Sequence, residues 1–303
     1  MQFQRDSRIC AFISRRTVLA NSIRPATLVV RDERIQEISY DTGEDVVQYL
    51  SQKYPGILFH DCGSLVLMPG IIDSHVHVNE PGRTEWEGFH TATRAAAAGG
   101  VTTIADMPLN SIPPTTTLNN LKIKAREAHS KIFVDVAFWG GVIPGNQHEL
   151  QSLIDAGVVG FKCFLCPSGV DEFPHVSVND VEKAFLQLLS TKTVLAFHAE
   201  CEESEGTNLL TDDPKMYETF LRSRPDLMEL NAVKLICDWC IKIELDNICH
   251  KNKLTPYQGK VLFGKVVATV LRGTFIFKEG NICDKPMGKL LLNANILQTI
   301  EIQ

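Results

Sequence analysis

Residues 69–80 read Pro-Gly-Ile-Ile-Asp-Ser-His-Val-His-Val-Asn-Glu, and this stretch decides both the fold and the site. A short apolar run leads into His75 and His77, which stand two positions apart. Residues i and i+2 of a β-strand point to the same face, so both imidazoles project side by side from a strand end. Neutral imidazole is a good ligand for zinc and neighbouring transition metals. The pattern indicates half of a metal site, although a strand end with two polar side chains and no metal would read the same.

The bulk composition is that of an ordinary acidic globular enzyme. The 303 residues are 44% hydrophobic and 22% charged, with a formal net charge of −6, and such a chain can bury one large core or two modest ones. No block of Lys or Arg stands out, which argues against nucleic acid as a partner. No apolar run is long enough to span a membrane.

The compartment is expected to be reducing and cytoplasmic. Nine cysteines, an odd number, are scattered without paired spacing. Residues 1–16 lack the apolar core of a secretory signal. They carry four arginines and one acid, which leaves a mitochondrial or peroxisomal location open; the alternative is that these arginines flank a strand over 9–13.

The pattern of apolar and polar residues changes along the chain. Residues 7–67 and the tail from 259 onward alternate in short β-like runs broken by polar or glycine turns. Between them, apolar strands alternate with helical stretches. Strands are expected at 71–78, 101–107, 132–139, 159–164 and 194–199, each followed by a helix, at 87–99, 118–131, 147–156, 178–190 and 226–242. Five consecutive β/α units predict parallel strands with crossover helices, an α/β fold.

The central strands end in groups able to do chemistry, as in (β/α)₈ barrels, whose active sites form at the C-terminal strand ends. His198 ends the fifth strand, although a lone histidine there is more often a satisfied core residue than a metal ligand. Lys162 lies within the fourth, where a free ammonium is costly to bury. Its head either extends to solvent or pairs with Asp106 or Glu200. Alternatively, CO₂ has converted its amine to a carbamate that bridges two metals.

Longer motifs carry a family resemblance. The segment Met68–His77 resembles the opening metal motif of the cyclic amidohydrolases, which include dihydroorotases, dihydropyrimidinases, hydantoinases and allantoinases. Three further segments resemble the allantoinase branch, namely 79–89, 99–110 and 157–164. The resemblance extends to the tail at 250–257. It implies an amidohydrolase-type TIM barrel over 69–246, with a small composite β-sandwich domain built from residues 1–67 and 250–303.

The resemblance also implies a site and a reaction. His75 and His77 would bind the first of two divalent metals, Lys162 would be the carbamylated bridge, and His198 would bind the second metal. Zinc is the expected metal, with cobalt or manganese open. The reaction would open the hydantoin ring of allantoin to give allantoate, in a homotetramer or another homo-oligomer.

Two residues are expected to contact the substrate. Asn110, at the end of the second barrel strand, would hold the ureide edge of allantoin. Arg83 is the other candidate contact, and its alternative role is an ion pair with Glu85 or Glu87.

The chain departs from this family pattern after the helix at 226–242. The family takes a further metal-binding histidine and a proton-carrying aspartate from later barrel strands, and here 243–246 runs into the tail without them. Residues 69–246 accommodate about five β/α units rather than eight. We therefore expect a partial barrel with open first and fifth strands, no identified catalytic acid or base, and impaired hydrolysis. The alternatives are an inactive truncated isoform or oligomer partner, and a dihydropyrimidinase- or hydantoinase-type cyclic amidase.

Overall fold

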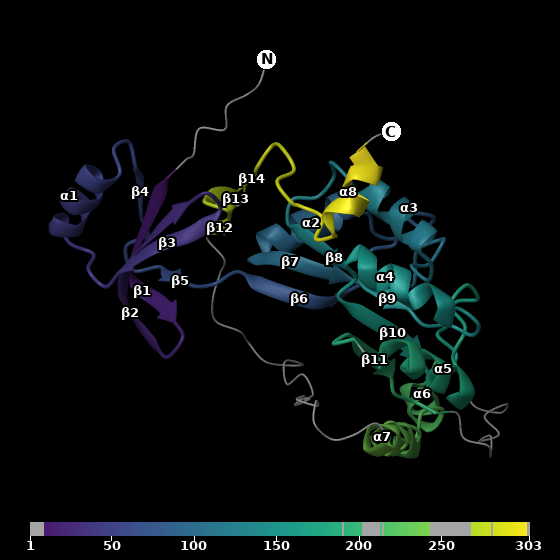
Figure 1. Cartoon of the computed structure of the whole chain (residues 1–303). Helices are drawn as coiled ribbons and strands as arrows, with labels where there is room; N and C mark the ends of the chain where they lie inside the picture. The colour runs from purple at the N-terminus through teal and green to yellow at the C-terminus, as the bar shows by residue number, and fades with distance from the viewer. Residues whose placement is uncertain are drawn as a thin grey trace.

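A computed structural model describes residues 9–189, 191–201, 213, 215–242, 268–279 and 281–301 (Figure 1). The N-terminal part is a sheet centred on β1 (Cys10–Leu19). Strand β1 pairs antiparallel with β2 and parallel with β4 and β5, and β3 lies outside β2. The bounds of the outer strands are β2 (Ser22–Arg31), β3 (Arg34–Ser39), β4 (Leu58–Asp61) and β5 (Val66–Leu67).

A helix interrupts this sheet, where only β-like runs were predicted. Helix α1 (Glu44–Lys53) buries Val46 and Leu50, four residues apart on one face, against Ala11 and Val29 of the sheet. That spacing is helical, and it was the signal in the sequence. The prediction of β-structure alone over 7–67 is therefore wrong for this segment.

The central part alternates strands and helices as predicted. Its elements are β6 (Ile71–Val76), α2 (Phe89–Ala98), β7 (Val101–Asp106), α3 (Leu118–Ala128), β8 (Asp135–Phe138), β9 (Gly140–Gly141), the 3₁₀ turn η1 (Gln147–Glu149), α4 (Leu150–Ala156), β10 (Gly160–Phe164), α5 (Val178–Leu188), β11 (Val194–His198), α6 (Tyr217–Arg222) and α7 (Asp226–Lys242). Helix starts follow capping chemistry. Thr117 accepts a hydrogen bond from the N–H of Asn120 at α3, and Ser177 forms a capping box with Asp180 at α5.

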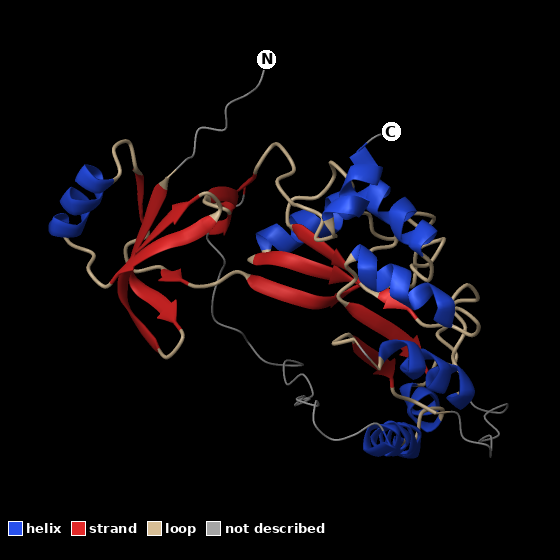
Figure 2. Ribbon diagram, viewed as in Figure 1, coloured by secondary structure: helices blue, strands red, loops and turns tan. Residues whose placement is uncertain are grey.

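All strand pairs in this part are parallel. One sheet has the order β6-β7-β8 and the other β9-β10-β11. Only Trp139 separates β8 from β9 in the chain. The N–H of Val159, just before β10, also donates to the carbonyl of Phe138 in β8 at 3.0 Å. The two sheets are therefore continuous and form one arc. Helices α2 to α5 lie on one side of this arc (Figure 2). The arrangement is a TIM-barrel-type α/β fold, and its incompleteness stays a prediction.

The C-terminal part contacts both preceding parts (Figure 1). It comprises β12 (Ala268–Leu271), β13 (Thr274–Lys278), β14 (Asn281–Ile282) and α8 (Ala294–Glu301). Phe275 packs edge-on against Phe12 and His60 of the N-terminal sheet, with ring centroids 5.9 and 5.1 Å away. On the other side, Leu290 forms a parallel bridge with Val136 of β8.

These contacts are of the kind that a composite domain would make, and the predicted domain division stays a prediction. The tail motif at 250–257 lies outside the described residues. None of the helices in the described ranges has the length and apolarity to cross a membrane.

Candidate metal centre

The two histidines of the opening motif lie together where β6 ends. His75 is in the strand and His77 follows it, and their ring centroids are 5.4 Å apart. The N–H of His75 donates to the Asp73 carboxylate at 3.1 Å. Parallel pairing sets Val76 opposite Asp106 of β7. The strand end therefore presents two adjacent imidazoles beside the end of the next strand.

Lys162 lies in the middle of β10 and is only 6% exposed. Its Nζ atom is 5.2 Å from the ring centroid of Phe164. Among the residues that the structure describes, no carboxylate forms an ion pair with it. Asp106 pairs with Lys124, and Glu200 contacts His198 and Arg224. The alternative that Lys162 pairs with Asp106 or Glu200 is therefore wrong.

The surroundings of His75 and His77 lower their pKa values and so favour the neutral imidazole, which is the form that binds a metal. Burial lowers the pKa of His75, and the charges of Lys162 and His198 lower it further. Burial together with neighbouring positive charge lowers the pKa of His77 to about 4. Burial also lowers the pKa of Lys162. Both histidines are thus neutral at pH 7, and the lysine is brought nearer to the free amine that reacts with CO₂.

His198 ends β11 opposite Phe164 in the ladder. The two rings stack with centroids 4.7 Å apart and planes 14° apart. His198 Nε2 lies 3.0 Å from Glu200 Oε1. The thiol of Cys166 joins them, since the ligand atoms of these three side chains lie within 4.8 Å of one another. Sequence reasoning identified His198 but not Cys166 or Glu200 as its neighbours.

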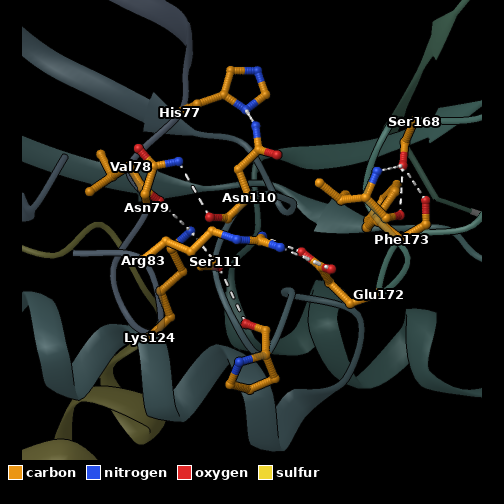
Figure 3. Close-up of polar contacts among 12 residues, drawn as sticks. His77, Val78, Asn79, Arg83, Asn110, Ser111, Lys124, Ser168, Glu172 and Phe173 are labelled. Atoms are coloured by element: carbon orange, nitrogen blue, oxygen red, sulfur yellow. Dashed lines mark hydrogen bonds and ion pairs between the residues drawn. The ribbon is translucent and has the colours of Figure 1, made fainter. Parts of the chain in front are cut away.

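Asn110 faces His77 (Figure 3). Asn110 Nδ2 is 3.1 Å from His77 Nδ1, and its carbonyl accepts a hydrogen bond from Asn79 Nδ2 at 3.3 Å. Its backbone has φ = 70°, a left-handed conformation that asparagine tolerates better than most residues. The predicted substrate residue therefore lies directly beside a predicted metal ligand.

Arg83 is bound by Glu172, a residue that no motif in the sequence singles out. Its guanidinium pairs with the Glu172 carboxylate, and one of the contacts is 3.3 Å (Figure 3). The guanidinium also lies 4.9 Å from the centroid of the Trp86 ring. Hydrogen bonding to Glu172 lowers the pKa of that carboxyl and raises that of Arg83. The alternative of an ion pair with Glu85 or Glu87 is wrong. The actual pair ties the loop after β6 to the loop after β10.

A buried ion pair beneath the site was also missed. Lys124 of α3 has no exposed side-chain surface, and its Nζ is 2.5 Å from Asp106 Oδ2. It also donates to the carbonyls of Val78 and Met107 and to the Ser111 hydroxyl, at 3.2, 3.4 and 3.1 Å. Asp106 Oδ1 accepts from the N–H of Val78 at 2.7 Å. This network holds the backbone that follows His77 against the end of β7.

The donor set suits divalent transition metals. Two imidazoles lie at the end of β6, a third ends β11, and Lys162 in β10 is buried without a described carboxylate partner. A carbamate on that lysine would supply the missing negative charge. Asp106, in contrast, serves the buried pair with Lys124.

Comparisons with known proteins agree with this geometry. The amidohydrolase family model matches residues 66–257. The chain is 47% identical over 265 residues to the mitochondrial allantoinase of Aquarana catesbeiana, covering 88% of this chain and 52% of that one. It is 41% identical over 236 residues to the allantoinase of Saccharomyces cerevisiae, covering 77% and 51%.

Solved structures give the same result. The L-hydantoinase (dihydropyrimidinase) of Arthrobacter aurescens superposes with a TM-score of 0.65 at 27% identity, over 77% of this chain and 51% of that one. The chain thus spans about half the length of the relatives it matches. The family model, the sequence relatives and the superposed structure all agree, and the chain belongs to the amidohydrolase family.

Proposed function

We propose that this chain is an allantoinase-type hydrolase that opens the hydantoin ring of allantoin to give allantoate. Relatives that carry the allantoinase name are 41% and 47% identical to it, whereas the hydantoinase that it superposes on is 27% identical. That difference favours allantoin over hydantoin or dihydropyrimidine substrates. The reaction is hydrolysis of a cyclic amide C–N bond.

The observation that supports the proposal is Lys162, which is buried without a described carboxylate partner and whose charge contributes to lowering the pKa values of both His75 and His77. His75 and His77 would hold one divalent metal, His198 a second, and a carbamate on Lys162 would bridge them. Zinc is the expected metal, with cobalt or manganese as substitutes. Bound metals at such a site supply an activated water and polarise the scissile carbonyl.

The other residues would bind and orient the substrate. The Asn110 side chain can hydrogen-bond the ureide edge, since its amide lies at the same strand end as His77. Arg83 would border the substrate from the loop after β6, with its guanidinium held in place by Glu172.

Proton transfer is the weak point of this site. Among the described residues, both strand-end carboxylates that could carry a proton are already engaged, Asp106 by Lys124 and Glu200 by Arg224 and His198. The segment 243–246, after which the family's aspartate would be expected, lies outside the described residues. Because a general acid or base contributes about 10²–10⁴-fold, we expect slower turnover than in the yeast relative by about that factor.

The test is an allantoin assay on the whole chain, supplied with Zn²⁺ or Co²⁺ and bicarbonate. Allantoate should form slowly, and His75→Ala or Lys162→Ala should abolish it. His148→Ala is the matched control, because that side chain is 70% exposed and lies on η1. Hydantoin and dihydrouracil in parallel assays separate the branches of the family. Allantoate formation that survives both site variants, or none above the buffer rate, would refute the proposal.

The remaining proposals concern organisation. We propose a composite β-domain from residues 1–67 and 250–303, a partial barrel over 69–246, and assembly into a homotetramer or another homo-oligomer. The cytoplasm is the proposed location, with mitochondria or peroxisomes as alternatives. Sedimentation of the purified chain and fluorescence microscopy of a tagged form test the last two points.

A further inference from the structure

A cluster of three different donor side chains lies where β10 and β11 end. Cys166 follows β10 by two residues, and Glu200 follows His198 by two. The carbonyl of His198 accepts hydrogen bonds from the N–H groups of Leu165 and Glu200, at 3.3 and 3.0 Å. The bond from Leu165 joins the two strand ends, and the bond from Glu200 turns the chain back after β11. The sulfur, imidazole and carboxylate ligand atoms lie within 4.8 Å of one another.

Two of the three donors, His198 and Glu200, are held in place by a neighbouring side chain. Stacking on Phe164 fixes the plane of the His198 ring. Arg224 binds one Glu200 oxygen, Oε2, and leaves Oε1 facing His198 Nε2 at 3.0 Å. Cys166 is 3% exposed and forms no disulfide. A metal ion would replace the direct contact between Nε2 and Oε1, with the thiolate of Cys166 as its third ligand.

The geometry points to a mononuclear site for a thiophilic transition metal, zinc foremost, formed by Cys166, His198 and Glu200. Sulfur, nitrogen and oxygen are the ligand types that zinc takes, and three protein ligands leave a fourth position for water. A thiolate disfavours Mg²⁺ and Ca²⁺, which require oxygen. The thiolate and carboxylate together also balance the charge of a divalent ion. Arg224 acts as the outer partner that orients Glu200.

This site is distinct from the one assigned to His75, His77 and Lys162, although the two share His198. It does not rest on the proposed function, since none of its evidence involves allantoin or a carbamate. Because His198 is common to both, occupancy of the thiolate site would compete with the bridged pair for that imidazole.

Binding of Co²⁺ can be used to detect a thiolate ligand by absorption spectroscopy. Co²⁺ titrated into the chelator-treated whole chain should give a thiolate-to-metal charge-transfer band in the near ultraviolet, with a stoichiometry of one for that band. Cys166→Ala should remove the band, and Arg224→Gln should weaken cobalt binding by about 10–100-fold, the usual cost of losing an outer-sphere partner. Cys201→Ser is the matched control, since Cys201 lies beside Glu200 but outside the cluster.

His75→Ala separates this proposal from the proposed function. It should keep the band while losing allantoin turnover, whereas His198→Ala should lose both. A band that persists in Cys166→Ala, or that disappears in Cys201→Ser, would overturn the thiolate site. So would cobalt binding with no charge-transfer band, and neither result would bear on the allantoin assay.

Discussion

Strands β6 and β10 both carry proposed metal ligands, yet they sit in opposite surroundings. All five residues of β10 are buried, and the strand has neighbours on both sides. Five of the six residues of β6 are exposed, and within the described ranges it pairs only with β7. Ile72 in its middle is 68% exposed. Packing therefore positions Lys162, whereas something other than packing has to position His75 and His77.

Polar anchors take that role at β6. Lys124, paired with Asp106, donates a hydrogen bond to the carbonyl of Val78, the residue just after His77. The indole N–H of Trp139 donates to the carbonyl of Ser74 at 2.9 Å. Burial thus positions one proposed ligand, Lys162, whereas hydrogen bonds position the other two, His75 and His77. The two halves should respond differently to substitution.

Breaking the ion pair between Lys124 and Asp106 should have the largest effect on the free energy of unfolding. Lys124→Met leaves the buried Asp106 carboxylate without its partner, and such a loss costs about 3–5 kcal/mol in free energy of unfolding. Urea unfolding of the whole chain measures it. Lys122→Met, on the same helix but half-buried, should stay within about 0.5 kcal/mol of the original. A cost below about 1 kcal/mol for Lys124→Met would mean that the pair does not anchor β6.

The same substitution on neighbouring strands sharpens the comparison. Ile104 of β7 is 2% exposed, and Ile104→Ala should cost about 2–5 kcal/mol because it leaves a cavity in the core. Ile72→Ala on β6 should change the free energy of unfolding by no more than about 0.5 kcal/mol. Equal costs in chemical denaturation would show that the exposed face of β6 is covered in solution.

The smallest effect is expected at the surface of the N-terminal sheet. A hydrogen bond from Lys53, at 2.8 Å, lowers the pKa of Glu37. Because the folded pKa is depressed, the stabilisation is present above the ordinary glutamate pKa of 4.5 and is lost as the pH falls through the folded pKa. Lys53→Met should therefore raise the Glu37 pKa, measured from carboxyl ¹³C shifts, with little change in the melting temperature. An unchanged pKa would mean that the pair does not form in solution.

Short-range patterns predicted much of this structure. The five parallel strands and their helices are confirmed, because the alternation of apolar and amphipathic stretches is local information. The rule that parallel strands end at one edge is also the basis for expecting His75, His77 and Lys162 to converge, and that convergence stays a prediction. Helix α1 was missed although Val46 and Leu50 carried its spacing.

The pairings across the site could not have been predicted. Arg83 and Glu172 are 89 positions apart, and only the folded loops bring them together. Lys124 reads as a surface lysine in an amphipathic helix, since nothing local shows that the end of β7 lies over it. The meeting of Cys166 with Glu200 likewise depends on the register of β10 and β11.

The bridge between Leu290 and Val136 has a consequence for synthesis of the chain. The N–H of Lys289 donates to the Asp135 carboxylate across 154 positions, and the Cys10 thiol donates to the carbonyl of Gly273 across 263. A ribosome adds residues one after another, so β8 emerges long before its tail partner. Contacts of such sequence separation slow folding, and until they form the nascent chain exposes apolar strands that are prone to aggregate. The demand for chaperones during translation should thus be greatest between the synthesis of β8 and that of residues 289–290, which pair with it.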